Sequence, residues 1–238
     1  MPDAATLSAG CILVSLVLYA LFGGADFGGG VWDLLARGPR AADRRRLTAG
    51  AIGPVWETNH IWLIVAIVIL FTAFPRAFAV VSTALFVPLS IVLAGIVLRG
   101  AAFSFHAYRL HEERGAGRWG VVFASASLAT PVFLGIVFGA ISSGRIRATE
   151  PLAFTGDVRV WLSPFPISVG FLALASFAFL AAVYLILETG DPGLREEFRR
   201  DSLRSAAAVV FLSGLALALA ADGAQEFFLA LTGGDSHR

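Results

Sequence analysis

Four ionisable residues stand inside two long apolar stretches near the start of the chain. Asp26 and Asp33 lie in GGADFGGGVWDLL, and Glu57 and His60 lie in PVWETNHIWL. Ionisable side chains are costly in a bilayer and usually face the interior of a helix bundle, where they mark functional sites. A carboxyl group held in such a place can accept and release a proton. The pattern predicts proton transfer as the chemistry of this region.

The spacing of the acidic residues around the basic segment RGPRAADRRR predicts their depth. Asp26 lies 11 residues before Arg37, and Glu57 lies 11 residues after Arg46. At a rise of about 1.5 Å per residue, both carboxylates lie about 16 Å from the same membrane boundary. Asp33, seven residues after Asp26, shares its helix face nearer that boundary. We expect a ladder of acids that begins at Asp33 and reaches Asp26 and Glu57.

Structural roles stay open for each of these residues. Asp33 is also explained as a boundary residue near Arg37, and Asp26 as a hydrogen-bond partner of a neighbouring helix. Glu57 is also explained as a packing partner of His60 or of an arginine, and His60 as a hydrogen-bonded helix residue. Glu57-x-x-His60 matches half of a di-iron carboxylate site, but the chain has no second Glu-x-x-His. We expect no metal ligands in this chain.

The composition indicates a membrane environment for the helices that carry these residues. The 238 residues are 57% hydrophobic and 15% charged, and apolar runs long enough to cross about 30 Å of hydrocarbon recur along the chain. These runs do not alternate with period two, which disfavours a barrel. The predicted fold class is an all-α integral membrane protein, a bundle of about six transmembrane helices. The predicted spans cover about 7–35, 47–71, 78–98, 119–141, 165–187 and 205–221.

The distribution of arginine predicts the orientation of the bundle. All 18 basic residues are arginine, and thirteen of them fall in the connections after the first, third and fifth spans. Arg99 is counted among the thirteen, because it directly follows the third span at Leu98. Spans three, four and six are expected to contain no ionisable residue in their interiors. The positive-inside rule then places these connections in the cytoplasm and both termini outside. The net charge of +1 gives no reason to expect a nucleic-acid partner, and the single Cys11 excludes an intrachain disulfide.

Glycine and proline residues predict where helices approach one another. Gly24 and Gly28 form a small-xxx-small pattern, and Gly28, Gly29 and Gly30 loosen the helix beside Asp26. Pro54 removes one backbone donor from the second span. We expect close helix packing as the main effect of these residues and local hydration as the second. The supporting shell that we expect around the acidic residues consists of Trp56, Asn59, His60 and Trp62.

Four ordered motifs occupy the first half of the chain: GGADFGGGVWDLLARG, AIGPVWETNHIWLI, LFTAFPRAF and RGAAFSFHAY. Together they resemble subunit II of the cytochrome bd-type quinol oxidases. The resemblance is dense over residues 19–108 and continues more weakly through TPVFLGIVFG and YLILETGD. Several motifs in one order within one membrane hairpin are far more specific than any single motif.

The resemblance implies a non-haem-ligating subunit of a quinol:oxygen oxidoreductase of the aerobic respiratory chain. In such a complex the b- and d-type haems are ligated by the partner, subunit I, quinol is the substrate, and protons come from the cytoplasm. The resemblance implies that Asp26 and Glu57 belong to a proton path. The isolated chain is expected to be inactive, because it has no plausible redox centre of its own. Quinone, lipid and small accessory subunits are further expected partners. The expected location is the bacterial or archaeal plasma (inner) membrane.

The family has eight or more spans in two four-helix halves, whereas this sequence predicts six. We expect one transmembrane domain over 1–238, in which 1–142 is the first four-helix half with the acidic hairpin and 143–238 is an incomplete second half. Two other functions stay open: a stand-alone proton- or cation-coupled transporter, and a purely structural scaffold for subunit I. A transporter of that design usually has paired broken helices in two related halves, whereas only the first hairpin is acidic here.

Overall fold

The structure of the chain, a computed structural model, describes the backbone of residues 3–109, 118–146 and 157–233. It describes the side chains of these residues except at 52–58, 103–109 and 118–120. Throughout this part of the chain the regular elements are helical. They are α1 (Ala4–Leu35), α2 (Ala41–Ala73), α3 (Pro75–Ala84), α4 (Phe86–Arg109), α5 (Arg118–Ser142), a short 3-10 helix (Val158–Val160), α6 (Pro164–Glu188), α7 (Pro192–Gly223) and α8 (Gln225–Thr232).

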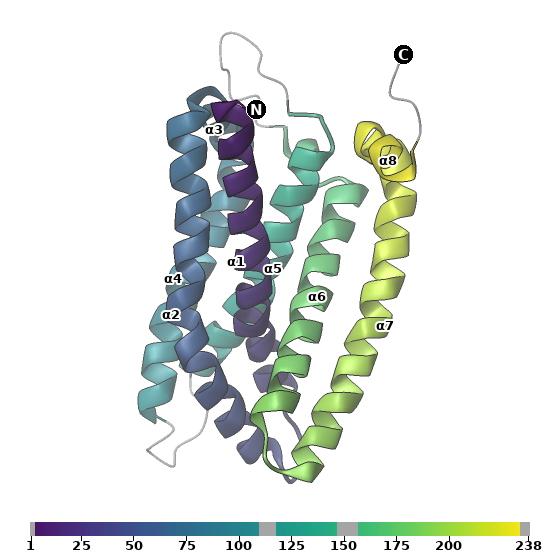
Figure 1. The fold of residues 1–238 in the computed structure, drawn as a ribbon. Coiled ribbons are helices and arrows are strands. Elements are labelled where there is room, and N and C mark those ends of the chain that lie inside the picture. The colour runs from purple at the N-terminus through teal and green to yellow at the C-terminus, as the bar shows by residue number, and fades with distance from the viewer. Residues whose placement is uncertain (1–2, 110–117, 147–156, 234–238) are drawn as a thin grey trace.

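The long helices lie side by side in an elongated bundle (Figure 1). Helix α1 packs against α2, α5 and α6, and α6 packs in turn against α5 and α7. Trp32 links α1 to α6, because its Nε1 donates to the carbonyl oxygen of Ala178 on α6 at 2.8 Å. The later part of α1, which carries Asp26, is therefore covered by helices on several sides.

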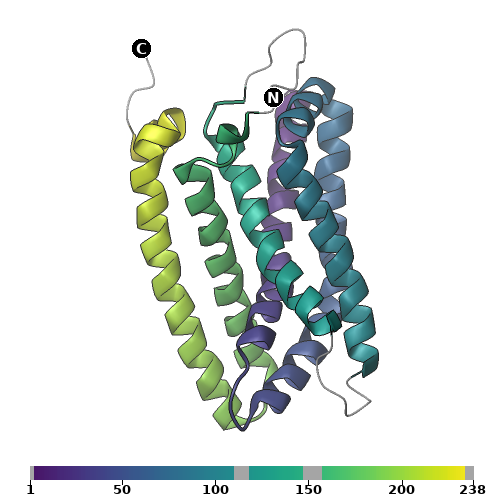
Figure 2. The ribbon, with the colours of Figure 1, turned by 180° about the vertical axis from the view of Figure 1, so that it is seen from behind.

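The two ends of the bundle differ in charge. The start of α1 and the short α8 lie at one end, and the connections from α1 to α2 and from α6 to α7 lie at the other (Figures 1 and 2). The arginine-rich starts of α2 and α7 therefore share one end of the molecule. This is the end that the positive-inside rule places in the cytoplasm, and that orientation stays a prediction.

The predicted membrane fold is confirmed in its class. Four of the described helices are long and apolar enough to cross a bilayer, namely α1, α5, α6 and α7. Residues 59–73 of α2 and the whole of α3 pass the same test only as a pair bent by 117°. The count of six spans and the outward placement of both termini stay predictions.

Local sequence explains where several helices begin. Asp3 precedes α1 and accepts a hydrogen bond from the backbone N–H of Thr6 at 2.7 Å, which satisfies a free donor of the first turn. Pro75 occupies the first turn of α3, where its missing N–H costs nothing. Asp191 and Pro192 open α7 in the same way, with an aspartate cap followed by proline.

Candidate functional site

Asp26 on α1 and Arg99 on α4 are the two most buried charged residues that the structure describes, with 0% and 1% of their surface exposed. Arg99 Nη1 donates to Asp26 Oδ2 at 2.8 Å, and Arg99 Nη2 lies 2.8 Å from Asp26 Oδ1. Nη2 also donates to the backbone carbonyl oxygen of Asp26 at 2.6 Å. Hydrogen bonds between charged groups, such as the one to Oδ2, are about twice as strong as those between neutral groups.

Arg99 is held by more than the carboxylate. Its Nε donates to the hydroxyl of Ser127 on α5 at 3.1 Å. Its guanidinium carbon lies 4.8 Å from the ring centroid of Phe27 and 5.1 Å from that of Phe123, within the range of a cation–π interaction. The guanidinium thus joins α1, α4 and α5, and its position does not depend on Asp26 alone.

The placement of Arg99 corrects the sequence analysis. We expected Arg99 in a cytoplasmic connection after a span that ends at Leu98, and we expected no ionisable residue inside the third span. Instead α4 continues to Arg109, and Arg99 is buried inside it. A buried arginine is tolerated because the carboxylate of Asp26 compensates its charge. Without Arg99, twelve arginines remain in the predicted cytoplasmic connections against five elsewhere, so the charge bias keeps its direction.

The glycines of α1 lie where other helices approach its backbone. Gly24 and Gly28 face α6, and a methyl group on Gly28 would meet the backbone carbonyl of Phe177. Gly30 faces α5, and a methyl group there would meet the hydroxyl of Ser127. Gly29 is also buried. This close approach surrounds Asp26 with protein rather than with lipid.

Asp33 lies at the arginine-rich end of α1, two turns from Asp26. Its side chain is half-buried, and its backbone carbonyl accepts a hydrogen bond from Arg45 Nε at 3.4 Å. The side chains of Glu57, Trp56 and Pro54 lie outside the described residues, although the helical backbone of α2 continues through them. The predicted alignment of Glu57 with Asp26 therefore stays a prediction.

The remaining members of the predicted supporting shell lie at the contact between α1 and α2. Asn59 has 0% of its surface exposed and faces Gly23 of α1. The ring of His60 meets the ring of Tyr19 edge to face, with centroids 6.4 Å apart. Trp62 is partly buried against an apolar cluster that contains Tyr19. Sequence reasoning missed Tyr19, whose place seven residues before Asp26 was the available signal.

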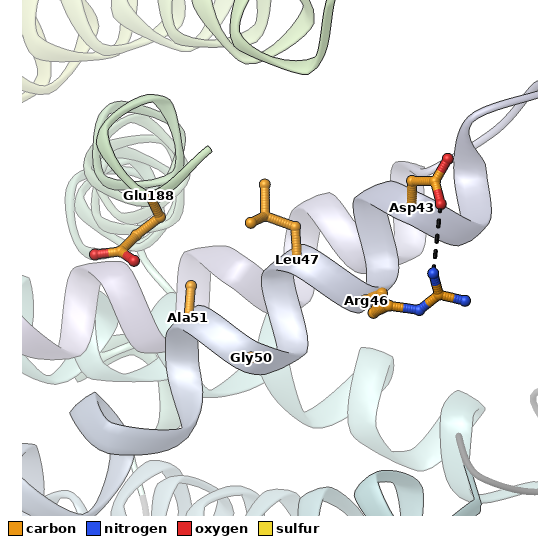
Figure 3. Close-up of a pocket in the computed structure, with 6 residues that line it drawn as sticks. All are labelled: Asp43, Arg46, Leu47, Gly50, Ala51 and Glu188. Atoms are coloured by element: carbon orange, nitrogen blue, oxygen red, sulfur yellow. Dashed lines mark ion pairs between the residues drawn. The ribbon is translucent and has the colours of Figure 1, made fainter. Parts of the chain in front are cut away.

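The arginine-rich end of the bundle carries a second group of charges. An open cleft of about 450 Å³ lies between α2 and the end of α6 (Figure 3). Its walls combine apolar and charged side chains, and its lining residues are Asp43, Arg46, Leu47, Gly50, Ala51 and Glu188. Asp43 and Arg46 pair across one helical turn at 3.7 Å, and Glu188 stands apart from them at the end of α6.

Helix α2 is tied to α7 near this end. Arg44 Nη2 donates to Asp201 Oδ2 at 2.6 Å, and Arg44 Nη1 donates to Glu197 Oε2 at 3.4 Å. The guanidinium carbon of Arg44 also lies 4.7 Å from the ring centroid of Phe198. The start of α2 and the start of α7 are therefore held together by charge and by packing. Within the described residues, no group of three or more His, Cys, Asp or Glu side chains is placed to hold a metal ion.

These features define a multi-pass helical membrane protein with an ion pair buried among α1, α4 and α5. The chain belongs to the cytochrome bd terminal oxidase subunit II family, whose model matches residues 4–233. The resemblance found in the sequence motifs is thereby confirmed. The bacterial inner membrane, where the proteins of this family reside, is accordingly the location of the chain.

Relatives and a solved structure agree with this assignment. Cytochrome bd-I ubiquinol oxidase subunit 2 of Escherichia coli K12 is 29% identical over 186 residues, which cover 76% of this chain and 48% of the relative. Cytochrome bd ubiquinol oxidase subunit 2 of Bacillus subtilis is 32% identical over 135 residues, which cover 56% and 39%. The chain thus spans about half the length, or less, of these curated relatives.

The fold has a counterpart in the structure of the bd oxidase from Geobacillus thermodenitrificans. The two match with a TM-score of 0.75 at 22% sequence identity, over 96% of this chain and 70% of the other. At this identity the match establishes the fold, and the all-helical membrane architecture is confirmed by it.

Proposed function

We propose that the chain is the non-haem-ligating subunit of a cytochrome bd-type quinol:oxygen oxidoreductase and that it packs against a haem-bearing subunit I. The observation that supports this function is the family match over residues 4–233, together with relatives named as ubiquinol oxidase subunits. In this complex the b- and d-type haems belong to subunit I, quinol is oxidised, and oxygen is reduced to water. Alone, the chain is inactive. Lipid, quinone and small accessory subunits are its further partners.

Within that complex, Asp33, Asp26 and Glu57 help to conduct protons from the cytoplasm. Asp33 lies at the arginine-rich end, and Asp26 lies two turns deeper on the same helix. If Asp26 takes up a proton, Arg99 still keeps its bonds to the Asp26 carbonyl oxygen and to Ser127. The positive charge therefore stays in place while the carboxylate changes its protonation, which is what a relay beside a fixed charge requires.

The ion pair also favours a second candidate, a structural scaffold for subunit I. Removing one partner of a buried pair leaves an uncompensated charge and costs about 3–5 kcal/mol, whereas apolar replacement of both partners is often neutral. In this second function Asp26 is a permanent counter-ion of Arg99, and the pair fixes α1, α4 and α5 in one arrangement.

A paired substitution separates the two functions. Asp26→Asn alone should lower the yield of assembled complex, because Arg99 is left unpaired. Asp26→Leu combined with Arg99→Met should restore assembly. If Asp26 relays protons, the assembled double variant should reduce oxygen at least about 100-fold more slowly per haem, the usual contribution of a positioned proton-transfer group. Unchanged turnover per haem would leave only the scaffold function.

The matched control is Asp222→Asn. Asp222 is an exposed acid near the far end of α7 from the arginine-rich segments. The Asp222→Asn variant should change neither the assembly of the complex nor its turnover. Oxygen consumption with a quinol donor, normalised to the haem absorption of the purified complex, measures all of these variants.

A further inference from the structure

Three buried polar atoms beside the ion pair have no hydrogen-bond partner among the described residues. They are the hydroxyl oxygen of Tyr19 and both amide atoms of Asn59, Oδ1 and Nδ2. Tyr19 has 4% and Asn59 0% of its surface exposed. Buried polar atoms in native proteins are almost always paired, either with protein groups or with ordered water. Three such atoms at one helix contact require a partner.

The two side chains meet the same contact from opposite helices. Asn59 on α2 faces α1 at Gly23, where a methyl group would lie 2.8 Å from Asn59 Nδ2. Tyr19 precedes Gly23 by one helical turn and packs its ring against His60, the residue after Asn59. Asp26 follows Gly23 by three residues, on the same side of α1. The Asn59 amide and the Tyr19 ring therefore belong to the same stretch of the α1–α2 contact.

The chemistry of these atoms selects a small neutral ligand. Since Asn59 has none of its surface exposed, neither lipid nor a partner subunit can reach it. The amide offers two donors and one acceptor, and the hydroxyl offers one donor and one acceptor. Neither group carries a formal charge, and the nearby charges of Asp26 and Arg99 compensate each other, so the site offers an ion no net counter-charge.

We propose that α1 and α2 enclose a bound water between the Tyr19 hydroxyl and the Asn59 amide. A buried water needs two to four polar partners, and these three atoms supply them. The water extends the polar region around Asp26 and Arg99 toward the start of α1. Its presence does not depend on whether protons pass through Asp26, so failure of the proton relay would leave it unaffected.

A structure of the assembled complex, at a resolution that shows ordered water, tests the site directly. We expect a density peak within hydrogen-bond distance of both Asn59 Nδ2 or Oδ1 and Tyr19 Oη. The absence of a peak, or an amide paired with a protein group instead, would overturn the proposal.

A double-mutant cycle gives an independent test, because the thermal midpoint should fall if water is bound and should stay or rise if the site is dry. If water bridges the two side chains, Tyr19→Phe and Asn59→Leu should each lower the thermal midpoint of the complex by about 2–4 °C. The double variant should lose less than the sum, because the first substitution already removes the bridge. If the atoms are dry, each substitution removes an unpaired polar group, so the midpoint should stay or rise and the effects should add.

Thr72→Val is the control for the loss of a hydroxyl group on α2. Thr72 is exposed, and its hydroxyl bonds only within its own helix, to the carbonyl of Val68 at 2.8 Å and that of Ile69 at 3.4 Å. This variant should keep the wild-type midpoint. The water site would be refuted if Thr72→Val kept the wild-type midpoint while the midpoint changes of Tyr19→Phe and Asn59→Leu were additive. It would also be refuted if either of these two variants raised the midpoint.

Discussion

At Gly28 the backbone of α6 lies directly against α1. A methyl group there would meet the backbone carbonyl of Phe177, and a backbone atom cannot move aside as a flexible side chain can. We expect Gly28→Ala to force the two helices apart and to lower the stability of the complex by about 1–3 kcal/mol, the usual effect of overpacking. Differential scanning fluorimetry of the purified complex measures the change.

Gly10→Ala on the same helix is the control for Gly28. Nothing lies within 4 Å of a methyl group at Gly10, so this change should keep or raise stability by up to about 1 kcal/mol through helix propensity. Equal midpoints for the two variants would contradict the close contact between α1 and α6.

Single residues differed in how far the sequence could predict them. Asp26 stood out because a carboxylate inside an apolar run is rare and costly. Arg99 did not, because it falls at the edge of an apolar window and is followed by Gly100, which is typical of a span end. Its partner is 73 residues away, and the pairing depends on which helices touch. Hydropathy contains no information on that contact.

At the scale of elements, the bond between α2 and α7 depends on Arg44. The side chains of Arg44 and Asp201 are 11% and 10% exposed, and Asp201 has a second, weaker partner in Arg204 at 3.4 Å. We expect Arg44→Leu to destabilise the complex by about 1.5–3 kcal/mol, the usual worth of a hydrogen bond to a charged group. Chemical unfolding followed by tryptophan fluorescence measures it.

Arg46→Leu is the matched control on the same helix. Arg46 is 81% exposed and pairs only within its own helix, with Asp43 at 3.7 Å. Pairs of this kind contribute about 0–1 kcal/mol, so the variant should resemble the wild type. If Arg46→Leu destabilised the complex as much as Arg44→Leu, the effect would come from the loss of positive charge at this end. The specific bond between Arg44 and α7 would then not explain it.

The start of α7 should respond to acid through Asp191. The backbone N–H groups of Leu194 and Gly193 donate to its carboxylate, and they hold the pKa of Asp191 below its ordinary value of 3.8. A carboxyl group whose pKa is lowered in the folded state stabilises the fold above its unfolded pKa, and this stabilisation is lost as the pH falls through the folded pKa. The first turn of α7 should therefore loosen below pH 3.8.

Amide hydrogen exchange at Gly193 and Leu194, corrected for the intrinsic rate at each pH, measures this loosening. Asp191→Asn keeps an acceptor oxygen but cannot titrate, so its corrected exchange should show no step over the same range. Identical profiles for the variant and the wild type would show that Asp191 does not control the helix start.

The bounds of the helices could be predicted where an apolar run coincides with the whole helix. Helices α1, α5 and α6 match predicted spans to within a few residues. Helix α7 begins at Pro192, well before the predicted start at residue 205, because its first turns are polar and lie outside the apolar window. The predicted third span is divided at Leu85 between α3 and α4. Pro88 follows Leu85 by three residues and has no N–H to bond the carbonyl of Ala84, so the sequence did contain a signal for this break that the hydropathy reading did not use.

At the scale of the whole molecule, α6 connects the later helices to the acidic first hairpin. It packs against α1 and α5 on one side and against α7 on the other. Composition predicted a helical membrane bundle, but the order in which the helices touch required the structure. The division of the chain into a half over 1–142 and an incomplete half over 143–238 stays a prediction.

The central claim is that this chain works as the haem-free subunit of a bd-type quinol oxidase. Purification of the tagged chain from native membranes, with an absorption spectrum and mass spectrometry of the eluate, tests it most directly. We predict that b- and d-type haem absorption and a second, haem-bearing membrane subunit elute with the chain, and that haem is absent from the chain separated from that subunit. A chain that elutes alone and without haem, while the remaining membranes keep their bd-type spectrum, would contradict the account.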